Sequence, residues 1–275
     1  MIVDAQIHVW EADRPDRPWP AGGADRRTAQ PQRAEPMSAA EALAAMDAAA
    51  VDRAILVPPS WEGDRNDVAL AAAAAHPGRF AVMGRVPADI TPDVLARWRD
   101  RPGMLGIRTI LSTEGAWVRE GADHWLWGVA AEAGIPAMVA PAGNVRLLHA
   151  LATRHPRLPL IVDHMGARVH RTGSAAFLDI EAIAALAPLP NVAIKATSLP
   201  SYSAETRPWR DVTPYLRRLF DAFGAERLFW GSDLSRLPCR YAELVAFFRE
   251  DLPWLGPAER DLVMGEALLA RLGWA

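Results

Sequence analysis

Eight short apolar segments, separated by longer helical patterns, constrain the fold of this chain more than any other feature of its sequence. Each segment is bounded by proline, glycine, asparagine or a charged residue, as the buried strands of a parallel sheet usually are. The candidate strands are residues 2–7, 54–57, 80–86, 105–110, 137–140, 160–162, 192–195 and 228–230.

The order of these segments predicts a closed α/β barrel. Strand and helix alternate along the whole chain, which is the rhythm of βαβ units in a parallel sheet. A (β/α)₈ barrel takes about 250 residues. Eight units in 275 residues therefore favour that barrel over its alternative, an open doubly wound sheet. Since we find neither a repeat nor a linker, we expect a single TIM-barrel domain over residues 1–275, with its active site at the C-terminal ends of the strands.

Charge and hydropathy narrow the choice of partners. A formal net charge of −3 provides no basic field for nucleic acid. No apolar stretch reaches the roughly 18 residues of a membrane span, and the N-terminus lacks the basic start of a signal peptide. One cysteine, Cys239, fits a reducing compartment. We expect a cytoplasmic protein with a small-molecule substrate and no nucleic-acid or membrane partner; homo-oligomerisation stays open.

Polar residues follow several of the apolar segments, where a parallel barrel carries its chemistry. A single histidine or arginine at a strand end is more often a capping or ion-pair residue than a catalyst. Four such residues from four strands, all directed at one mouth, instead predict a catalytic site. The candidate catalytic residues are His8, Arg108, His164 and Asp233. The candidate substrate contacts are Gln6, Ser60, Trp61, Arg85, Lys195 and Tyr202.

Several motifs resemble those of the amidohydrolase-related barrels. Residues 4–10 (Asp-Ala-Gln-Ile-His-Val-Trp) are similar to the opening Asp-x-His-x-His-x-Trp signature of that family. Residues 163–166 are similar to its Asp-His-x-Gly motif, and residues 230–233 to its Trp-Gly-Ser-Asp motif. Residues 106–108, 191–195 and 265–272 also fit, so the resemblance covers essentially the whole chain in order.

Within this family the chain most resembles the branch of sugar lactonases and 2-pyrone-4,6-dicarboxylate lactonases, because residues 60–66 are similar to the loop after strand two in that branch. The resemblance implies hydrolysis of a lactone, which several members carry out without a metal. It implies Asp233 as the general base that acts on water. It also implies His8, His164 and Arg108 around the lactone carbonyl and ring oxygen.

One departure from the family pattern concerns metal. Gln6 stands where the signature has its first histidine, and a neutral amide is a poor ligand for zinc. We therefore expect no cofactor and no tightly bound zinc. If a divalent metal is present, the remaining candidate ligands are His8, His164 and Asp233.

A second departure concerns the substrate. The dicarboxylate enzymes of this branch carry further arginines where this chain has Glu114 and the loop 198–202. The sequence thus favours a neutral sugar lactone or a monocarboxylate over a dicarboxylate. We expect desolvation at a dry barrel mouth to raise the pKa of Asp233, and Arg108 to supply a fixed donor for the carbonyl oxygen.

Two loops and several activities stay open at this point. The segment 13–36 is long for a connection and either covers the site or is mere decoration or disorder, and His170 lies in a loop within reach of the rim. A metal-dependent amidohydrolase or decarboxylase, and a lactone isomerase, are alternatives on the same barrel. A non-enzymatic binding barrel has only Gln6 in its favour. The fold alone decides none of this.

Overall fold

All eight apolar segments form parallel strands of one sheet, and no strand limit differs by more than one residue from its predicted position. The computed structural model describes residues 1–20, 32–111 and 116–275. The strands are hydrogen-bonded in sequence order. They are β1 (Val3–Ile7), β2 (Arg53–Leu56), β3 (Phe80–Arg85), β4 (Met104–Ile110), β5 (Ala137–Ala140), β6 (Leu160–Val162), β7 (Val192–Ala196) and β8 (Leu228–Trp230).

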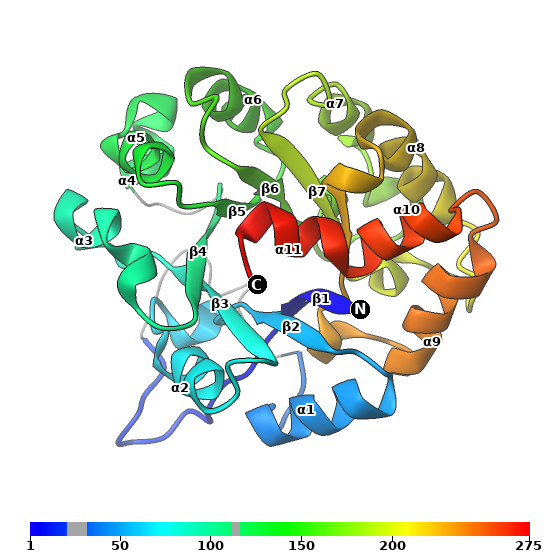
Figure 1. Cartoon of the computed structure of the whole chain (residues 1–275), viewed down its shortest axis with the longest axis horizontal. Coiled ribbons are helices and arrows are strands. Elements are labelled where there is room, and N and C mark those ends of the chain that lie inside the picture. Colours follow the sequence, from blue (N-terminus) through cyan, green and yellow to red (C-terminus); the bar gives the residue numbers. More distant parts are fainter. Residues whose placement is uncertain (21–31, 112–115) are drawn as a thin grey trace.

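The helices surround this sheet and form the outer layer of a (β/α)₈ barrel (Figure 1). In the described residues they are α1 (Ala39–Ala48), α2 (Asp67–Ala75), α3 (Pro92–Ala96), α4 (Ala116–Arg119), α5 (Trp125–Glu132), α6 (Val145–Arg154), α7 (Ile180–Ala184), α8 (Thr213–Phe223), α9 (Tyr241–Ala246), α10 (Pro257–Asp261) and α11 (Ala267–Leu272). Among them, none is long and apolar enough to cross a membrane.

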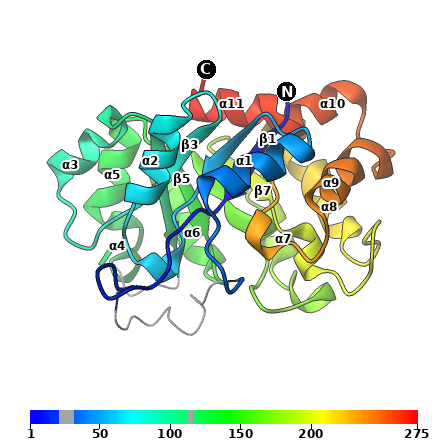
Figure 2. The same cartoon turned by 90° about the horizontal axis from the view of Figure 1, so that it is seen from below.

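The core has two parts, because successive strand residues point to opposite faces of the sheet. The larger part fills the space between the sheet and the helices. The smaller part lies inside the barrel and includes Ile55, Ile161 and Phe229. Leu268 and Leu272 of α11 pack against this inner cluster. Helix α11 therefore closes the N-terminal end of the barrel, together with both chain termini (Figure 2), which leaves the other end for a site.

Asp4 closes the seam between β8 and β1. Its Oδ1 accepts the backbone N–H groups of Gln6 and Ser232, each at 2.9 Å, and its Oδ2 accepts the hydroxyl of Tyr241 at 2.5 Å. Burial raises the pKa of Asp4 to about 6, although these hydrogen bonds lower it. The first residue of the opening signature is thus a structural tie between the first and last strands.

Gly231 lets the end of β8 approach its neighbours closely. A Cβ at this position would lie 2.5 Å from Cγ2 of Thr197 and 2.9 Å from the backbone nitrogen of Ala5, closer than real Cβ contacts come. Glycine is therefore required at this position for the end of β8 to pack against Thr197 and Ala5. The chain turns at Asp233, two residues later.

Candidate active site

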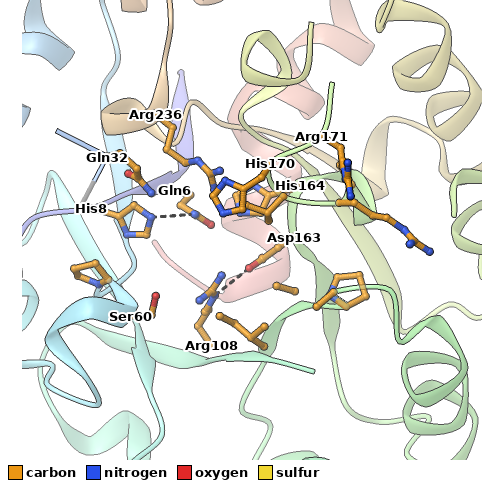
Figure 3. Close-up of a pocket in the computed structure, with 18 of the residues that line it drawn as sticks. Gln6, His8, Gln32, Ser60, Arg108, Asp163, His164, His170, Arg171 and Arg236 are labelled. Atoms are coloured by element: carbon orange, nitrogen blue, oxygen red, sulfur yellow. Dashed lines mark hydrogen bonds and ion pairs between the residues drawn. The ribbon is translucent and has the colours of Figure 1, made fainter. Parts of the chain in front are cut away.

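A cavity of about 400 Å³ opens at the C-terminal ends of the strands (Figure 3). Ten candidate residues were predicted from the sequence, and six of them line this cavity. These six are His8, Arg108, His164, Gln6, Ser60 and Trp61. They come from β1, β4, the turn after β6 and the turn after β2. The barrel thus brings together residues that lie far apart in the sequence.

Asp233 lies below the cavity wall rather than in it. Its side chain has no exposed surface. Its Oδ1 forms an ion pair with Nε2 of His8 at 3.0 Å, and its Oδ2 accepts the hydroxyl of Ser198 at 2.7 Å. Its backbone N–H donates to the carbonyl oxygen of Gln6 at 2.9 Å. The carboxylate therefore reaches the cavity mainly through His8, which does line it.

The last three strands each lead into a residue with left-handed backbone geometry. His164 has φ 54°, Ser198 has φ 60° and Asp233 has φ 55°. A non-glycine residue in this region costs free energy and persists only where surrounding contacts hold it, typically at functional sites. Three such turns at one mouth direct the side chains that follow β6, β7 and β8 towards one another.

The two ring nitrogens of His8 both face hydrogen-bond acceptors. Nδ1 lies 2.5 Å from the carbonyl oxygen of Val57, and Nε2 lies 3.0 Å from the carboxylate of Asp233. A carbonyl and an ionised carboxylate both accept hydrogen bonds, so a protonated His8 can donate to each of them. The amide nitrogen of Gln6 is 3.3 Å from Nε2, but Asp233 is closer and charged. Nε2 of His8 therefore lies between the carboxylate of Asp233 and the amide of Gln6, and its contact with Asp233 is the shorter one.

His164 is the uncharged histidine of the site. Its Nδ1 pairs with Oγ1 of Thr197 at 2.7 Å. Burial lowers the pKa of His164 to about 3, although Asp233 and Asp163 act in the opposite direction. The imidazole is thus neutral at pH 7. Because Thr197 engages Nδ1, Nε2 is left to meet a ligand in the cavity.

The charge state of Asp233 differs from the sequence-based expectation. Burial by itself does raise the pKa of this carboxyl, as expected for a dry barrel mouth. The charge and contact of His8 outweigh burial, and Arg236 adds to them, so the pKa of Asp233 lies well below its ordinary value. The expectation of a raised pKa was therefore wrong, because it omitted the cations that surround the carboxylate. Asp233 stays ionised at neutral pH.

A second buried charge cluster supports the floor of the cavity. Asp163 accepts from Nε of Arg108 at 3.1 Å and forms an ion pair with Nζ of Lys195 at 2.8 Å. Burial opposes the charge of Asp163, but Lys195 and Arg108 outweigh it and lower the pKa of Asp163 to about 2. Lys195 also donates to Oε1 of Gln6 at 2.6 Å. Asp163 thus orients Arg108 towards the cavity, and Lys195 orients Gln6.

Four of the sequence candidates do not reach the cavity wall. Besides Asp233 these are Arg85, Lys195 and Tyr202. The Nε of Arg85 lies 3.9 Å from Asp64 in the loop after β2. Lys195 is fully buried beneath the wall, and Tyr202 is buried with its ring against Phe177. A direct substrate contact by Arg85, Lys195 or Tyr202 therefore finds no support in this geometry.

Several wall residues escaped the sequence analysis. They are Gln32, Asp163, Arg168, Arg171 and Arg236, whereas His170 reaches the wall as its loop position suggested. Asp163 and Arg236 carried a usable signal, because each lies within three residues of a residue already chosen. Of the long segment 13–36, residues 21–31 lie outside the described residues, as does Glu114. Among the described residues of that segment, Gln32 lines the cavity.

The site does not fit a tetrahedral zinc ion. In the described part of the chain, no group of three or more His, Cys, Asp or Glu side chains is arranged to hold a metal. Both ring nitrogens of His8 are engaged by Val57 and Asp233. The Lys195 ammonium lies against Gln6, at the place of the missing ligand. A cation there would face a buried positive charge.

We expect protein purified without added metal to contain far less than one zinc per chain. The Gln6→His variant should raise zinc affinity, because it rebuilds the His-x-His pair. Elemental analysis and zinc titration of both proteins measure this, with Gln32→His as a matched control that adds a histidine elsewhere in the wall. About one zinc per wild-type chain would contradict the expectation.

Comparison with known proteins shows similarity over most of the chain. The family model described as Amidohydrolase matches residues 3–267. The L-fucono-1,5-lactonase of Burkholderia ambifaria is 29% identical over 289 aligned positions, which cover 96% of this chain and 92% of that protein. The 4-sulfomuconolactone hydrolase of Hydrogenophaga intermedia is 28% identical over 200 positions, which cover 68% of this chain and 62% of that enzyme.

Solved structures show the same fold. An amidohydrolase from Burkholderia multivorans, with bound zinc, superposes with a TM-score of 0.78 over all of both chains at 22% sequence identity. At that identity the likeness establishes the barrel and its strand order, and the chemistry has to come from the side chains of this chain.

Proposed function

The chain belongs to the amidohydrolase family, and from that premise we propose that it is a lactonase, which opens a lactone ring by adding water to the carbonyl carbon. The observation that carries the proposal is the buried Asp233–His8 ion pair at the cavity floor, with Arg108 in the wall. Two relatives are named for hydrolysing or acting on lactones, the L-fucono-1,5-lactonase and the 4-sulfomuconolactone hydrolase.

The proposed reaction needs a base, an acid and a site for negative charge. Asp233 accepts a proton from water as its oxygen forms a bond to the carbonyl carbon. Arg108 donates to the carbonyl oxygen, where negative charge develops. His8 gives its proton to the ring oxygen as the bond between that oxygen and the carbonyl carbon breaks. The product is a hydroxy acid, and no covalent intermediate is needed.

The proton movements of Asp233 and His8 depend on each other. A carboxylate with so low a pKa is a weak base while an imidazolium lies 3.0 Å away. When His8 passes its proton to the substrate, the cause of the low pKa disappears, and Asp233 can hold the proton of water. That proton then returns to His8 and restores the pair. The attacking water has to enter at the border of the pair, since Asp233 has no exposed surface here; catalytic contacts often form only once substrate is bound.

Arg108→Met should raise KM and lower kcat together. The variant keeps an unbranched apolar stem but removes the charge that would bind the carbonyl and stabilise its developing oxyanion. Loss of one such donor typically costs about 10²- to 10³-fold in kcat. Steady-state kinetics on a hydrolysed lactone measure both constants. The control is Arg157→Met, an exposed arginine outside the cavity wall. If KM rises and kcat is unchanged, Arg108 binds the substrate but does not stabilise the oxyanion.

A hydrolysis screen tests the function itself. Aldonolactones and muconolactones are offered with a pH indicator, with and without chelator, and ring opening is expected to release acid in both conditions. Activity that chelator abolishes would favour a metal-dependent amidohydrolase or decarboxylase. Conversion of one lactone into another, without release of hydroxy acid, would favour an isomerase.

A further inference from the structure

The cavity wall carries more positive than negative charge. Among the described residues, four arginines line it, against one carboxylate, that of Asp163. The arginines are Arg108, Arg168, Arg171 and Arg236. A desolvated guanidinium group requires an acceptor, and an anion satisfies it best. The question is therefore which of the four already have one.

Two of the arginines have a carboxylate of their own. Arg108 donates from Nε to Asp163 at 3.1 Å. Arg168 donates from Nε and from one terminal nitrogen to both oxygens of Asp179, at 3.0 and 3.1 Å. That bidentate contact is the geometry in which arginine and carboxylate fit best. Arg168 is thus held by the protein.

The other two arginines lack such a partner. The Nε of Arg236 is 3.7 Å from Oδ2 of Asp233, too far for a hydrogen bond, and Oδ2 already accepts from Ser198. Across the described residues, no carboxylate oxygen lies within 4.0 Å of a side-chain nitrogen of Arg171. Arg236 has only 18% of its side chain exposed, so its charge is partly desolvated, and the carboxylate nearest to it is shared with His8.

Arg236 occupies the side of the cavity that faces Arg108. In the view of Figure 3, Arg236 and Arg108 lie on opposite sides of the labelled residues, with Gln6 between them. Gln32 stands next to Arg236, with Oε1 accepting from Ser235 at 2.5 Å, which turns its amide NH₂ group away from that contact. A ligand between the two arginines could accept a hydrogen bond from Arg108 at its carbonyl oxygen. Its other side would face the guanidinium group of Arg236.

We infer that the substrate is a lactone with an anionic substituent, a carboxylate or sulfonate, which Arg236 binds while Arg108 contacts the carbonyl. This inference rests on the proposed lactonase function. The sequence leaves two substrates open, the neutral sugar lactone and the monocarboxylate. The excess of arginines over carboxylates in the wall favours the second. A neutral ring would leave Arg236, among the described residues, with only its long ion pair to Asp233, a carboxylate that also pairs with His8.

A pair of matched lactones tests the anion site. The γ-lactone of hydroxyglutarate carries a free carboxylate, and the corresponding carboxamide lactone has the same shape without the charge. We expect wild-type kcat/KM to favour the carboxylate. Arg236→Gln should reduce that preference roughly 10- to 100-fold, the usual effect of losing a hydrogen bond to a charged group. Arg157→Gln, which removes an exposed arginine outside the wall, should leave both rates unchanged.

The inference fails if wild type hydrolyses the carboxamide as well as the carboxylate, or if Arg236→Gln lowers both rates equally. A binding measurement separates this outcome from failure of the lactonase proposal. Its probe is a carbocyclic ketone acid, in which a methylene replaces the ring oxygen of the carboxylate lactone. Calorimetric binding that Arg236→Gln abolishes, with no lactone hydrolysed, would retain the anion site and reject the lactonase. Hydrolysis of the carboxylate and carboxamide lactones at equal rates would retain the lactonase and reject the anion site.

Discussion

Replacing Asp233 with asparagine should lower kcat by about 10²- to 10⁴-fold and change KM little, because the amide keeps the size of the side chain but cannot accept a proton. The buried carboxylate also forms the ion pair with His8, at 3.0 Å. The variant therefore loses the base and the partner that holds the acid. Steady-state kinetics on a lactone identified in the screen measure the effect.

Two controls separate catalysis from folding in this experiment. Asp261→Asn removes an exposed carboxyl outside the cavity wall and should leave kcat unchanged. Thermal unfolding of Asp233→Asn shows whether the variant still folds. If a folded Asp233→Asn protein hydrolyses lactones within about threefold of wild type, Asp233 is not the base, because general-base catalysis contributes more than that.

The pH profile provides a related check. The pKa of Asp233 lies well below its ordinary value, and that of His164 is lowered to about 3. Both groups are therefore deprotonated throughout the range from about pH 5 to 9, and protonation of Asp233 cannot limit kcat/KM there. An acid limb in that range that is present in wild type and absent from Asp233→Asn would contradict this assignment.

Lys195→Met should cause the largest loss of stability. Lys195 is the chain's only lysine among 30 lysines and arginines, and it is fully buried against Asp163 at 2.8 Å. Removing one member of a buried ion pair typically costs about 3–5 kcal/mol, because the other charge stays desolvated. For a chain of this size we expect Tm to fall by roughly 6–20 °C. Thermal and denaturant unfolding measure the change.

Two matched controls test whether the unpaired charge of Asp163 causes this loss of stability. Lys195→Met combined with Asp163→Asn removes both charges and should recover part of the lost stability. Arg218→Met breaks an exposed ion pair with Glu181 and should change Tm little, since water screens that pair. A Lys195→Met protein that unfolds at the wild-type temperature would show that the pair does not stabilise the fold.

The stability contributed by Asp163 has a defined pH range. Its pKa is lowered to about 2 in the folded chain, against about 3.9 for an unfolded aspartate. Unfolding therefore takes up protons between these values, so the contribution is complete above pH 4 and is lost as the pH falls towards 2. Acid unfolding of Asp163→Asn should lack this component.

The sequence by itself determined the architecture and the gathering of the candidate residues. Apolar runs of strand length, separated by helical patterns, specify βαβ units because that periodicity is local. Parallel strands then bring all carboxyl ends to one mouth. From this rule alone His8, Arg108 and His164 were predicted to converge, and they do. The family motifs added the expectation of a lactonase.

Only the tertiary structure decided the charge states and the direction of each side chain. The pKa of Asp233 depends on His8, which lies 3.0 Å away in space but in the first strand. Lys195 and Arg85 lie at the C-terminal ends of β7 and β3, yet Lys195 lies under the cavity wall and Arg85 turns towards Asp64. Arg236 became a candidate because it lines the cavity and its only ion pair in the described residues, to Asp233, is too long for a hydrogen bond. Electrostatic interactions act through space between distant segments, so no local pattern in the sequence encodes them.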